Sequence, residues 1–339
     1  MKPSSATKLL PRLLFYSGIL SVALSSSVWG QSGFQRETDP IPPKVESLFS
    51  KGIKYLSSSQ NEQGSWSERY GEQPGVVALC TLAFLASGED PNAGPYSQNI
   101  SRALNHILSE QSSSNGYIGS SMYNHGFATL ALAESYGMVN DPRLATALKK
   151  AVDLILTAQK GNREKAWRYT PETDDADTTV TGCQIVALLA ARNAGIAVPD
   201  KAILEGLAYL DKCRSANGGI GYTSAGGTKP TLTAIGVTCF SLAKKKEGKE
   251  FAASVQFLRG HLSHRDRNYP FYFEYYMSQA LFHADPELWE DWNNRNIRYL
   301  SACQSSNGAW LDSKGSAYAT SCALLSLALN YRFLPIYEK

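Results

Sequence analysis

Apolar positions along the chain follow two alternating helical patterns. From Val45 to Gln60, apolar residues recur every three or four positions, with Lys and Ser on the other side, which is typical of a helix with one buried face. The next segment, Gly75 to Ser87, carries no charge. A helix that is apolar all round, yet only about a dozen residues long, is buried inside a protein and does not span a bilayer. The two segments therefore predict an outer helix followed by an inner helix.

This alternation continues, and six helix pairs are predicted. The later pairs, in order, are Tyr96 to Gln111 with Asn124 to Gly137, Arg143 to Gln159 with Thr178 to Ala191, Lys201 to Arg214 with Thr231 to Ala243, Phe251 to Leu262 with Asn268 to Phe282, and Trp289 to Gln304 with Ala317 to Asn330.

The charge pattern of the second helices favours a closed ring. An open solenoid of helix pairs would expose one helix layer on a concave binding face. Four of the six second helices carry no charge through their central run, so that layer has no face suited to water. We therefore predict an all-α fold, a single α/α toroid of six helix pairs over residues 45–335.

A repeated phrase supports this organisation. The segments Lys51 to Trp66 and Arg295 to Trp310 both place an aromatic residue and Leu five and four positions before Gln, Gly four after it and Trp six after it. Such self-similarity is the signature of a repeat architecture. We expect the Gln amide to bridge to the entering inner helix, the Gly to allow the turn, and the Trp to bury apolar area.

The phrase resembles the QW repeat of squalene and hopene cyclases, and the six-pair ring is similar to the barrel they share with protein prenyltransferase β subunits. Together these features resemble the exported prenyltransferase/squalene-oxidase repeat proteins of bacteria, over about Val45 to Pro335. The resemblance implies a ring that binds an elongated apolar ligand of isoprenoid type.

An acidic cluster directly before the third inner helix is the candidate catalytic site: Asp174, Asp175 and Asp177. Hopene-type cyclases hold a DxDD motif followed by Thr, whose middle acid protonates an alkene. Asp175 and Asp177 match its first two acids, while Thr178 replaces the third. Clustered carboxylates raise one another's pKa and keep one protonated. Helix capping by Asp177 is the competing interpretation. The substitution at Thr178 and the presence of one barrel instead of two weigh against alkene protonation.

Aromatic and polar residues near the starts of inner helices are the candidate substrate-binding set. If they face the ring's axis they would line an apolar cavity and stabilise cations through their ring faces. The alternative is that they fill the ring as core. The set comprises Tyr123, His125, Trp167, Tyr272, Glu274 and Tyr276.

No cofactor and no metal site is predicted. His261, His264 and Asp266 form a loop set without a fourth ligand. Gly71-Glu72-Gln73 is similar to a complement-type thioester motif, but Tyr70 stands where the thiol must be. The six cysteines fall in or at the ends of helical runs, so we expect buried free thiols.

The first 30 residues predict a secretory signal peptide. Three basic residues precede the apolar run Leu13 to Leu24, and a small-residue cleavage site follows near Gly30. An uncleaved anchor is the alternative. We expect an exported chain with a lead segment at residues 31–44 and no transmembrane segment after cleavage. Removing three of the 33 basic residues leaves 30 against 30 acidic ones, so no nucleic-acid partner is expected.

Two functions remain open from the sequence. The ring binds an apolar small molecule, with acid chemistry at the Asp cluster, or it is a non-catalytic interaction module with a protein partner. A glycan-acting enzyme is compatible with α/α toroids in general, but nothing specific in the sequence favours it.

Overall fold

The computed structural model describes residues 41–337, which form twelve α-helices and one 3-10 helix. The predicted signal peptide lies outside these residues and stays a prediction. The outer helices are α1 (Pro43–Ser59), α3 (Ser97–Ser109), α5 (Leu144–Gly161), α7 (Asp200–Lys212), α9 (Lys249–Arg259) and α11 (Pro286–Cys303). The inner helices are α2 (Pro74–Leu85), α4 (Met122–Tyr136), α6 (Thr178–Asn193), α8 (Pro230–Leu242), α10 (Pro270–Ala284) and α12 (Ser316–Ala328), and the 3-10 helix η1 spans Pro335–Tyr337.

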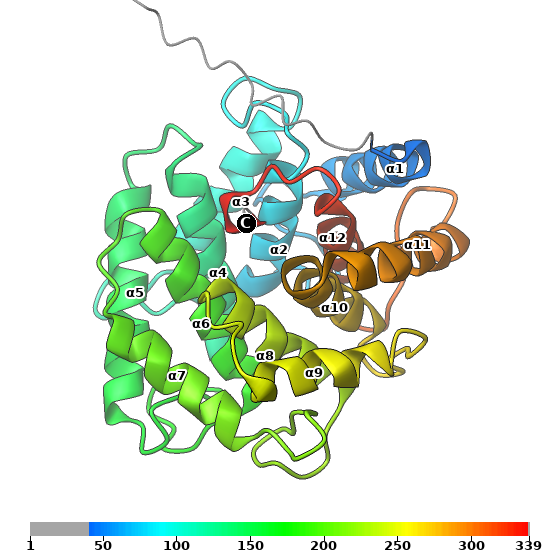
Figure 1. Ribbon diagram of the computed structural model, residues 1–339. Helices are drawn as coiled ribbons and strands as arrows, with labels where there is room; N and C mark the ends of the chain where they lie inside the picture. The colour runs from blue at the N-terminus through cyan, green and yellow to red at the C-terminus, as the bar shows by residue number, and fades with distance from the viewer. Residues whose placement is uncertain (1–40, 338–339) are drawn as a thin grey trace, which may run out of the picture. The chain divides into compact units, whose positions relative to one another are not determined.

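The inner helices form a closed ring. Each packs against the next one, and α12 packs against α2, so the first and last units meet (Figure 1). Each outer helix packs on the inner helix before it, with α1 on α12 closing the outer layer. The predicted α/α toroid of six helix pairs is confirmed.

The inner helices are buried on all sides, as their lack of charge predicted. All twelve residues of α2 are buried. Small residues let neighbouring inner helices approach closely, because a Cβ added at Gly182 of α6 would lie 2.1 Å from Cγ2 of Ile235 in α8. Within the described part of the chain, no helix is long and apolar enough to cross a membrane.

Helix α11 begins three residues before the predicted start at Trp289. The Asp285 carboxylate accepts a hydrogen bond from Leu288 N at 3.0 Å, and Pro286 occupies the first helical position. An Asp cap followed by Pro is a strong helix start, and it leaves only Asp285 between α10 and α11.

The repeated glutamine joins neighbouring outer helices, and the predicted bridge to an inner helix is wrong. Gln60 Nε2 donates to Asn99 O in α3 at 3.0 Å and to Gly64 O in its own loop at 3.1 Å. Gln111 and Gln159 make the corresponding pairs of bonds. The amide follows the end of one outer helix and therefore meets the first turns of the next, around the circumference of the ring.

Gln304 makes the same connection where the ring closes. Its Nε2 donates to Leu48 O of α1 at 2.9 Å and to Gly308 O at 3.0 Å. We expect Gln304→Ala to lower the free energy of unfolding by about 1–3 kcal/mol, because two partly buried carbonyls lose their donor. Urea unfolding of this variant beside Gln111→Ala measures the effect. Stabilities within about 0.5 kcal/mol of the native chain, the range of ordinary surface changes, would contradict it.

The repeated glycine and tryptophan have the predicted roles. Gly64 has φ +84°, and a Cβ there would lie 2.1 Å from Arg102 O, so both the turn and the close approach require glycine. The buried indole of Trp66 donates to Leu56 O at 3.1 Å, in the last turn of α1. That carbonyl lacks a partner within the helix.

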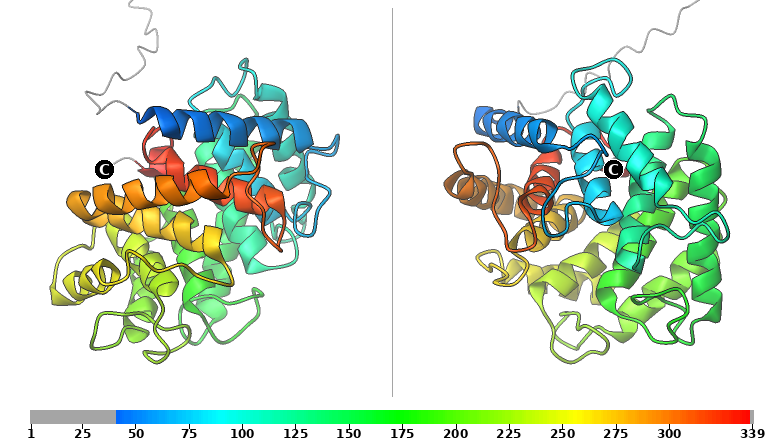
Figure 2. Two further views of the ribbon diagram at one scale, coloured as in Figure 1. Left: turned by 90° about the vertical axis from the view of Figure 1, so that its right-hand side faces the viewer. Right: turned by 180° about the vertical axis from the view of Figure 1, so that it is seen from behind.

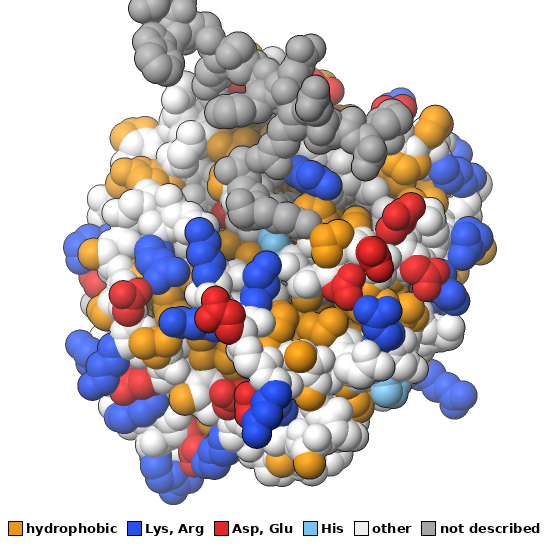
Figure 3. All heavy atoms as spheres, in the orientation of Figure 1, with side chains coloured by type: hydrophobic (Ala, Val, Ile, Leu, Met, Phe, Trp, Pro, Cys, Tyr) orange, Lys and Arg blue, Asp and Glu red, His pale blue; other side chains and the backbone are white. Residues whose placement is uncertain are grey.

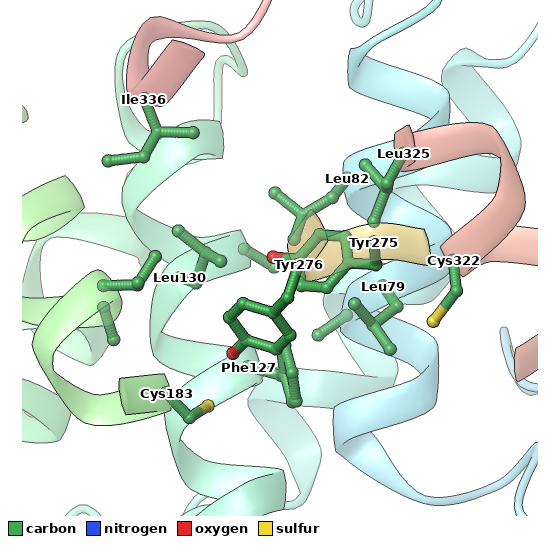
Figure 4. Close-up of a cluster of buried hydrophobic side chains, with 14 of the residues drawn as sticks. Leu79, Leu82, Phe127, Leu130, Cys183, Tyr275, Tyr276, Cys322, Leu325 and Ile336 are labelled. Atoms are coloured by element: carbon green, nitrogen blue, oxygen red, sulfur yellow. The ribbon is translucent and has the colours of Figure 1, made fainter. Parts of the chain in front are cut away.

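Side chains from the inner helices fill the middle of the ring. Tyr275 and Tyr276 of α10 converge there with Phe127 of α4 and with Leu79 and Leu82 of α2 (Figure 4), and all five are buried. The rings of Phe127 and Tyr275 have centroids 6.3 Å apart. The axis at this level is packed core. All six cysteines are free thiols, of which Cys303 is the exposed one.

Candidate functional site

The loops that lead into the inner helices gather at one end of the ring, which we call the mouth. In the left panel of Figure 2 the loops that follow α1 and α11 lie at the end opposite the C-terminus. Backbone hydrogen bonds join neighbouring parts of this end. Met122 N donates to Tyr169 O at 2.8 Å, and Thr178 N donates to Tyr222 O at 2.9 Å. The loops before α6 and α8 are thereby fixed to the starts of α4 and α6.

Asp177 caps α6 and is fully buried. Its Oδ1 accepts from Thr179 N at 2.8 Å, Val180 N at 2.9 Å and Thr179 Oγ1 at 2.6 Å. Oδ2 is buried and makes no hydrogen bond with normal geometry to the described residues, although Arg168 Nε lies 3.9 Å away. Burial raises the pKa of this carboxyl, while the Thr179 and Val180 hydrogen bonds and the nearby Tyr222 hydroxyl oppose the shift.

The other two acids of the cluster lie closer to solvent. The Asp175 side chain is 43% exposed and pairs with the Arg168 guanidinium. Asp174 is 62% exposed, and its carboxylate accepts from Arg163 N at 2.7 Å. The three carboxyls therefore do not form one buried set. Asp177 alone sits where desolvation favours the protonated form.

Three tyrosines surround Arg168 and Asp177. The Arg168 guanidinium carbon lies 5.2 Å from the Tyr169 ring centroid and 6.0 Å from that of Tyr222, and the two tyrosine hydroxyls are hydrogen-bonded. Tyr123 donates to Thr179 Oγ1, because that hydroxyl gives its own proton to Asp177. These residues form the mouth cluster: Tyr123, Arg168, Tyr169, Asp175, Asp177, Thr179 and Tyr222.

The mouth cluster has the components of an acid site. A buried carboxyl with a raised pKa keeps its proton to higher pH and can donate it, provided that a substrate reaches hydrogen-bond distance. Aromatic faces stabilise a neighbouring positive charge. The exposed fraction of Tyr169, 44%, leaves this side of the cluster open to solvent.

His125 lies away from the cluster, between α4 and α5. It is fully buried, its Nδ1 accepts from Ile118 N at 3.1 Å, and its Nε2 donates to Ala151 O at 3.0 Å. Burial lowers its pKa to about 4. Both ring nitrogens are used by backbone groups, so this geometry favours a structural role.

Trp167 takes the place of the repeat tryptophan in the third pair. Its buried indole donates to Ile155 O at 2.9 Å, four residues before Gln159, just as the Trp310 indole donates to Leu300 O at 2.9 Å, four before Gln304. A pattern that requires Trp six residues after Gln misses this copy of the repeat, because Trp167 follows Gln159 by eight residues.

The three candidates on α10 point in different directions. Tyr276 is buried in the axial core, and its ring lies 4.8 Å from that of the half-buried Tyr272. Glu274 is fully buried near Tyr299 of α11, with Arg265 Nε 3.4 Å from its Oε1. Glu274 therefore lies on the side of α10 away from the axis.

Sequence reasoning did not identify Arg168, Thr179 or Tyr222 as site residues. Arg168 could have been noticed, because it is the basic residue between two aromatics in the loop that also carries the acids. Among residues 41–337, no group of three or more His, Cys, Asp or Glu side chains is placed to hold a metal ion.

Comparison with solved structures identifies two enzyme classes that have this fold. A GH76 alpha-1,6-mannanase from Salegentibacter, in a variant with two neighbouring aspartates changed to asparagine and bound to alpha-1,6-mannotriose, matches with TM-score 0.66 and 9% identity, covering 84% of this chain and 99% of that one. A GH76 mannosidase from Bacteroides thetaiotaomicron matches with TM-score 0.62 and 11% identity, over 84% and 98%.

The second class is a terpene cyclase. The type II terpene cyclase MstE from Scytonema, bound to its product merosterolic acid A, matches with TM-score 0.58 and 13% identity, over 84% of this chain and 96% of that one. No protein-family model matches the sequence, and no curated protein matches it. At these identities the likeness establishes the shared α/α toroid.

Proposed function

We propose that this chain is an enzyme whose mouth cluster binds a small molecule and protonates it through Asp177. The observation that carries the proposal is the burial and the hydrogen bonding of the Asp177 carboxyl. It is fully buried with a raised pKa, one oxygen is held by the α6 cap, and the other lies 3.9 Å from Arg168 Nε without a hydrogen bond to the described residues. A capping role alone accounts for Oδ1 and not for the burial of Oδ2.

An elongated apolar ligand of isoprenoid type is the first candidate. Tyr123 and Tyr272 lie near one another at the mouth, and the Tyr272 ring packs against the ring of Tyr276 on the axis. These three side chains form a row of aromatic rings that begins beside Asp177. The presence of one barrel no longer weighs against cyclase chemistry, because the chain covers 96% of the terpene cyclase chain that it matches.

A glycan is the second candidate, and the polar rim favours it. Tyr169 is 44% exposed beside Arg168, and Tyr269 is 51% exposed beside Lys314. Exposed aromatic faces next to charged side chains suit a hydroxylated ligand. The two GH76 enzymes described above share the toroid, and one of them was bound to alpha-1,6-mannotriose.

The test incubates the full mature chain with squalene or farnesol and detects products by mass spectrometry. A parallel assay with alpha-1,6-mannotriose measures the reducing ends that are released. We expect Asp177→Asn to lower the rate at least about 100-fold, the usual contribution of a general acid, because Asn keeps the cap but cannot donate a comparable proton. Asp285→Asn is the matched control, since Asp285 also caps a helix but lies at the opposite end of the ring.

Turnover of squalene or farnesol supports the isoprenoid candidate, and cleavage of mannotriose supports the glycan. Full activity in Asp177→Asn overturns the acid role. A chain that neither binds nor converts these compounds, and that co-purifies with a protein, favours the interaction module instead.

A further inference from the structure

Arg168 lies between two carboxyl groups at the mouth. Its Nη1 is paired with the carboxylate of Asp175, whose side chain is 43% exposed. Its Nε lies 3.9 Å from Oδ2 of Asp177, which is fully buried and accepts no hydrogen bond with normal geometry from the described residues. One arginine therefore has two acidic neighbours and forms a hydrogen bond with only one of them.

Two tyrosine rings accompany the guanidinium in this position. Its central carbon lies 5.2 Å from the Tyr169 ring centroid and 6.0 Å from that of Tyr222. Contacts with aromatic faces attract a cation without fixing one hydrogen-bond direction. A displacement of about 1 Å toward Oδ2 would bring Nε to the 2.7–2.9 Å of a charge-assisted hydrogen bond. A small movement therefore separates the two pairings of Arg168.

The other groups that face the Asp177 carboxyl are neutral. Tyr123 of α4, Tyr209 of α7 and Tyr222 of the loop before α8 are close enough to interact with it, and burial raises the pKa of each phenol. These tyrosines carry no charge at the pH values where a carboxyl titrates. Among the described residues, Arg168 is the only cationic side chain within 4.0 Å of this carboxyl.

Distant charges have little influence on the choice between the two carboxyls. On the end of the ring opposite the mouth, basic and acidic side chains lie next to one another (Figure 3). Fields from interspersed charges of opposite sign largely cancel, and salt screens exposed charges beyond about 8–10 Å. The local pairing of Arg168 therefore decides whether a positive charge contacts Asp177 directly.

We propose that Arg168 is a positioning residue that can pair with either carboxyl, and that Asp175 keeps it away from Oδ2 so that Asp177 retains its proton. An opposite charge in hydrogen-bond contact favours the ionised form of a carboxyl. Arg168 bonded to Oδ2 would therefore convert Asp177 from a proton donor into a carboxylate. Asp175 is nearer to water, so its ion pair with the guanidinium requires less desolvation. The inference rests on the proposed acid role of Asp177 only for its effect on the reaction.

The test is the titration of Asp177 in the full mature chain, followed by nuclear magnetic resonance of aspartate labelled with carbon-13 at the carboxyl. The Asp177 signal is the one that the Asp177→Asn chain lacks. We expect Asp175→Asn to lower its titration midpoint by at least about one pH unit, the smallest effect of an opposite charge at close range. Asp174→Asn is the matched control, because it removes the same charge from the preceding residue, which lies beside Arg163, and it should leave the midpoint unchanged.

Two further variants separate movement of Arg168 from the direct effect of the Asp175 charge. Removing a negative charge favours ionisation of a neighbouring carboxyl even without an arginine. In an Arg168→Gln chain, Asp175→Asn should leave the Asp177 midpoint unchanged, because the two residues act through one interaction. Asp175→Glu keeps a carboxylate and should retain the native midpoint. An equal shift in both backgrounds would overturn the proposal, as would a native midpoint in Asp175→Asn.

This titration needs no substrate, so its failure is distinct from failure of the proposed function. If the chain converts one of the test compounds, the rate should decline at a lower pH in Asp175→Asn than in the native chain, because Asp177 must be protonated to act. The expected midpoints without turnover would support the role of Arg168 and count against the proposed function. Turnover together with a native midpoint in Asp175→Asn would reject the role of Asp175 and leave the acid function standing.

Discussion

Replacing Trp167 with alanine is expected to lower the free energy of unfolding by about 3–5 kcal/mol, the range for truncating a buried tryptophan. The side chain is 2% exposed, and its indole supplies the hydrogen bond to Ile155 O at 2.9 Å. The substitution therefore removes a large apolar contact and the hydrogen bond that the indole gives to a carbonyl of α5. Urea unfolding followed by circular dichroism measures the change.

Trp167→Phe is the companion variant, because it keeps much of the ring and loses the N–H donor. We expect it to cost about 1–2 kcal/mol, in line with the loss of one buried hydrogen bond and some volume. If Trp167 instead contacts substrate, Trp167→Ala would impair ligand binding while leaving stability close to that of the native chain. That result would reject a structural role for Trp167.

The second large effect is a fall in stability between about pH 5 and pH 8 that depends on Glu274. This carboxyl is fully buried, and burial raises its pKa from 4.5 to about 8, with Arg265 acting in the opposite direction. The folded state therefore keeps a proton that the unfolded state releases above pH 4.5. Because the unfolded state binds fewer protons across this interval, the free energy of unfolding decreases as pH rises, by about 3–5 kcal/mol in total.

Glu274→Gln should remove most of this pH dependence. Gln has nearly the same volume and stays neutral, so the variant is expected to be more stable than the native chain at pH 8. Urea unfolding at pH 5, 6.5 and 8 tests it, with Glu290→Gln on the exposed side of α11 as the control. A Glu274→Gln chain with the same slope as the native chain would show that other groups cause the dependence.

The sequence by itself determined the architecture. Amphipathic helices alternate with uncharged ones, and only the amphipathic helices can face water. The uncharged helices must therefore form the inside of a closed ring, and the six pairs could be counted directly. The Gly and Trp of the repeat were also interpretable, because a tight turn and a large buried side chain have few physical alternatives. The cap at Asp177 followed from an acid placed directly before a helix.

Only the tertiary structure decided which way the side chains of the inner helices point. A helix that is apolar all round has no periodicity to fix its rotation, so nothing in the sequence separates Tyr276 on the axis from Glu274 against α11. The acceptors of Gln60 and Trp167 were beyond sequence reasoning for a related reason, since one is supplied by the next repeat and the other follows an irregular loop. The burial of Ile336 within the ring likewise depends on where the last helix ends in space, which a local pattern does not encode.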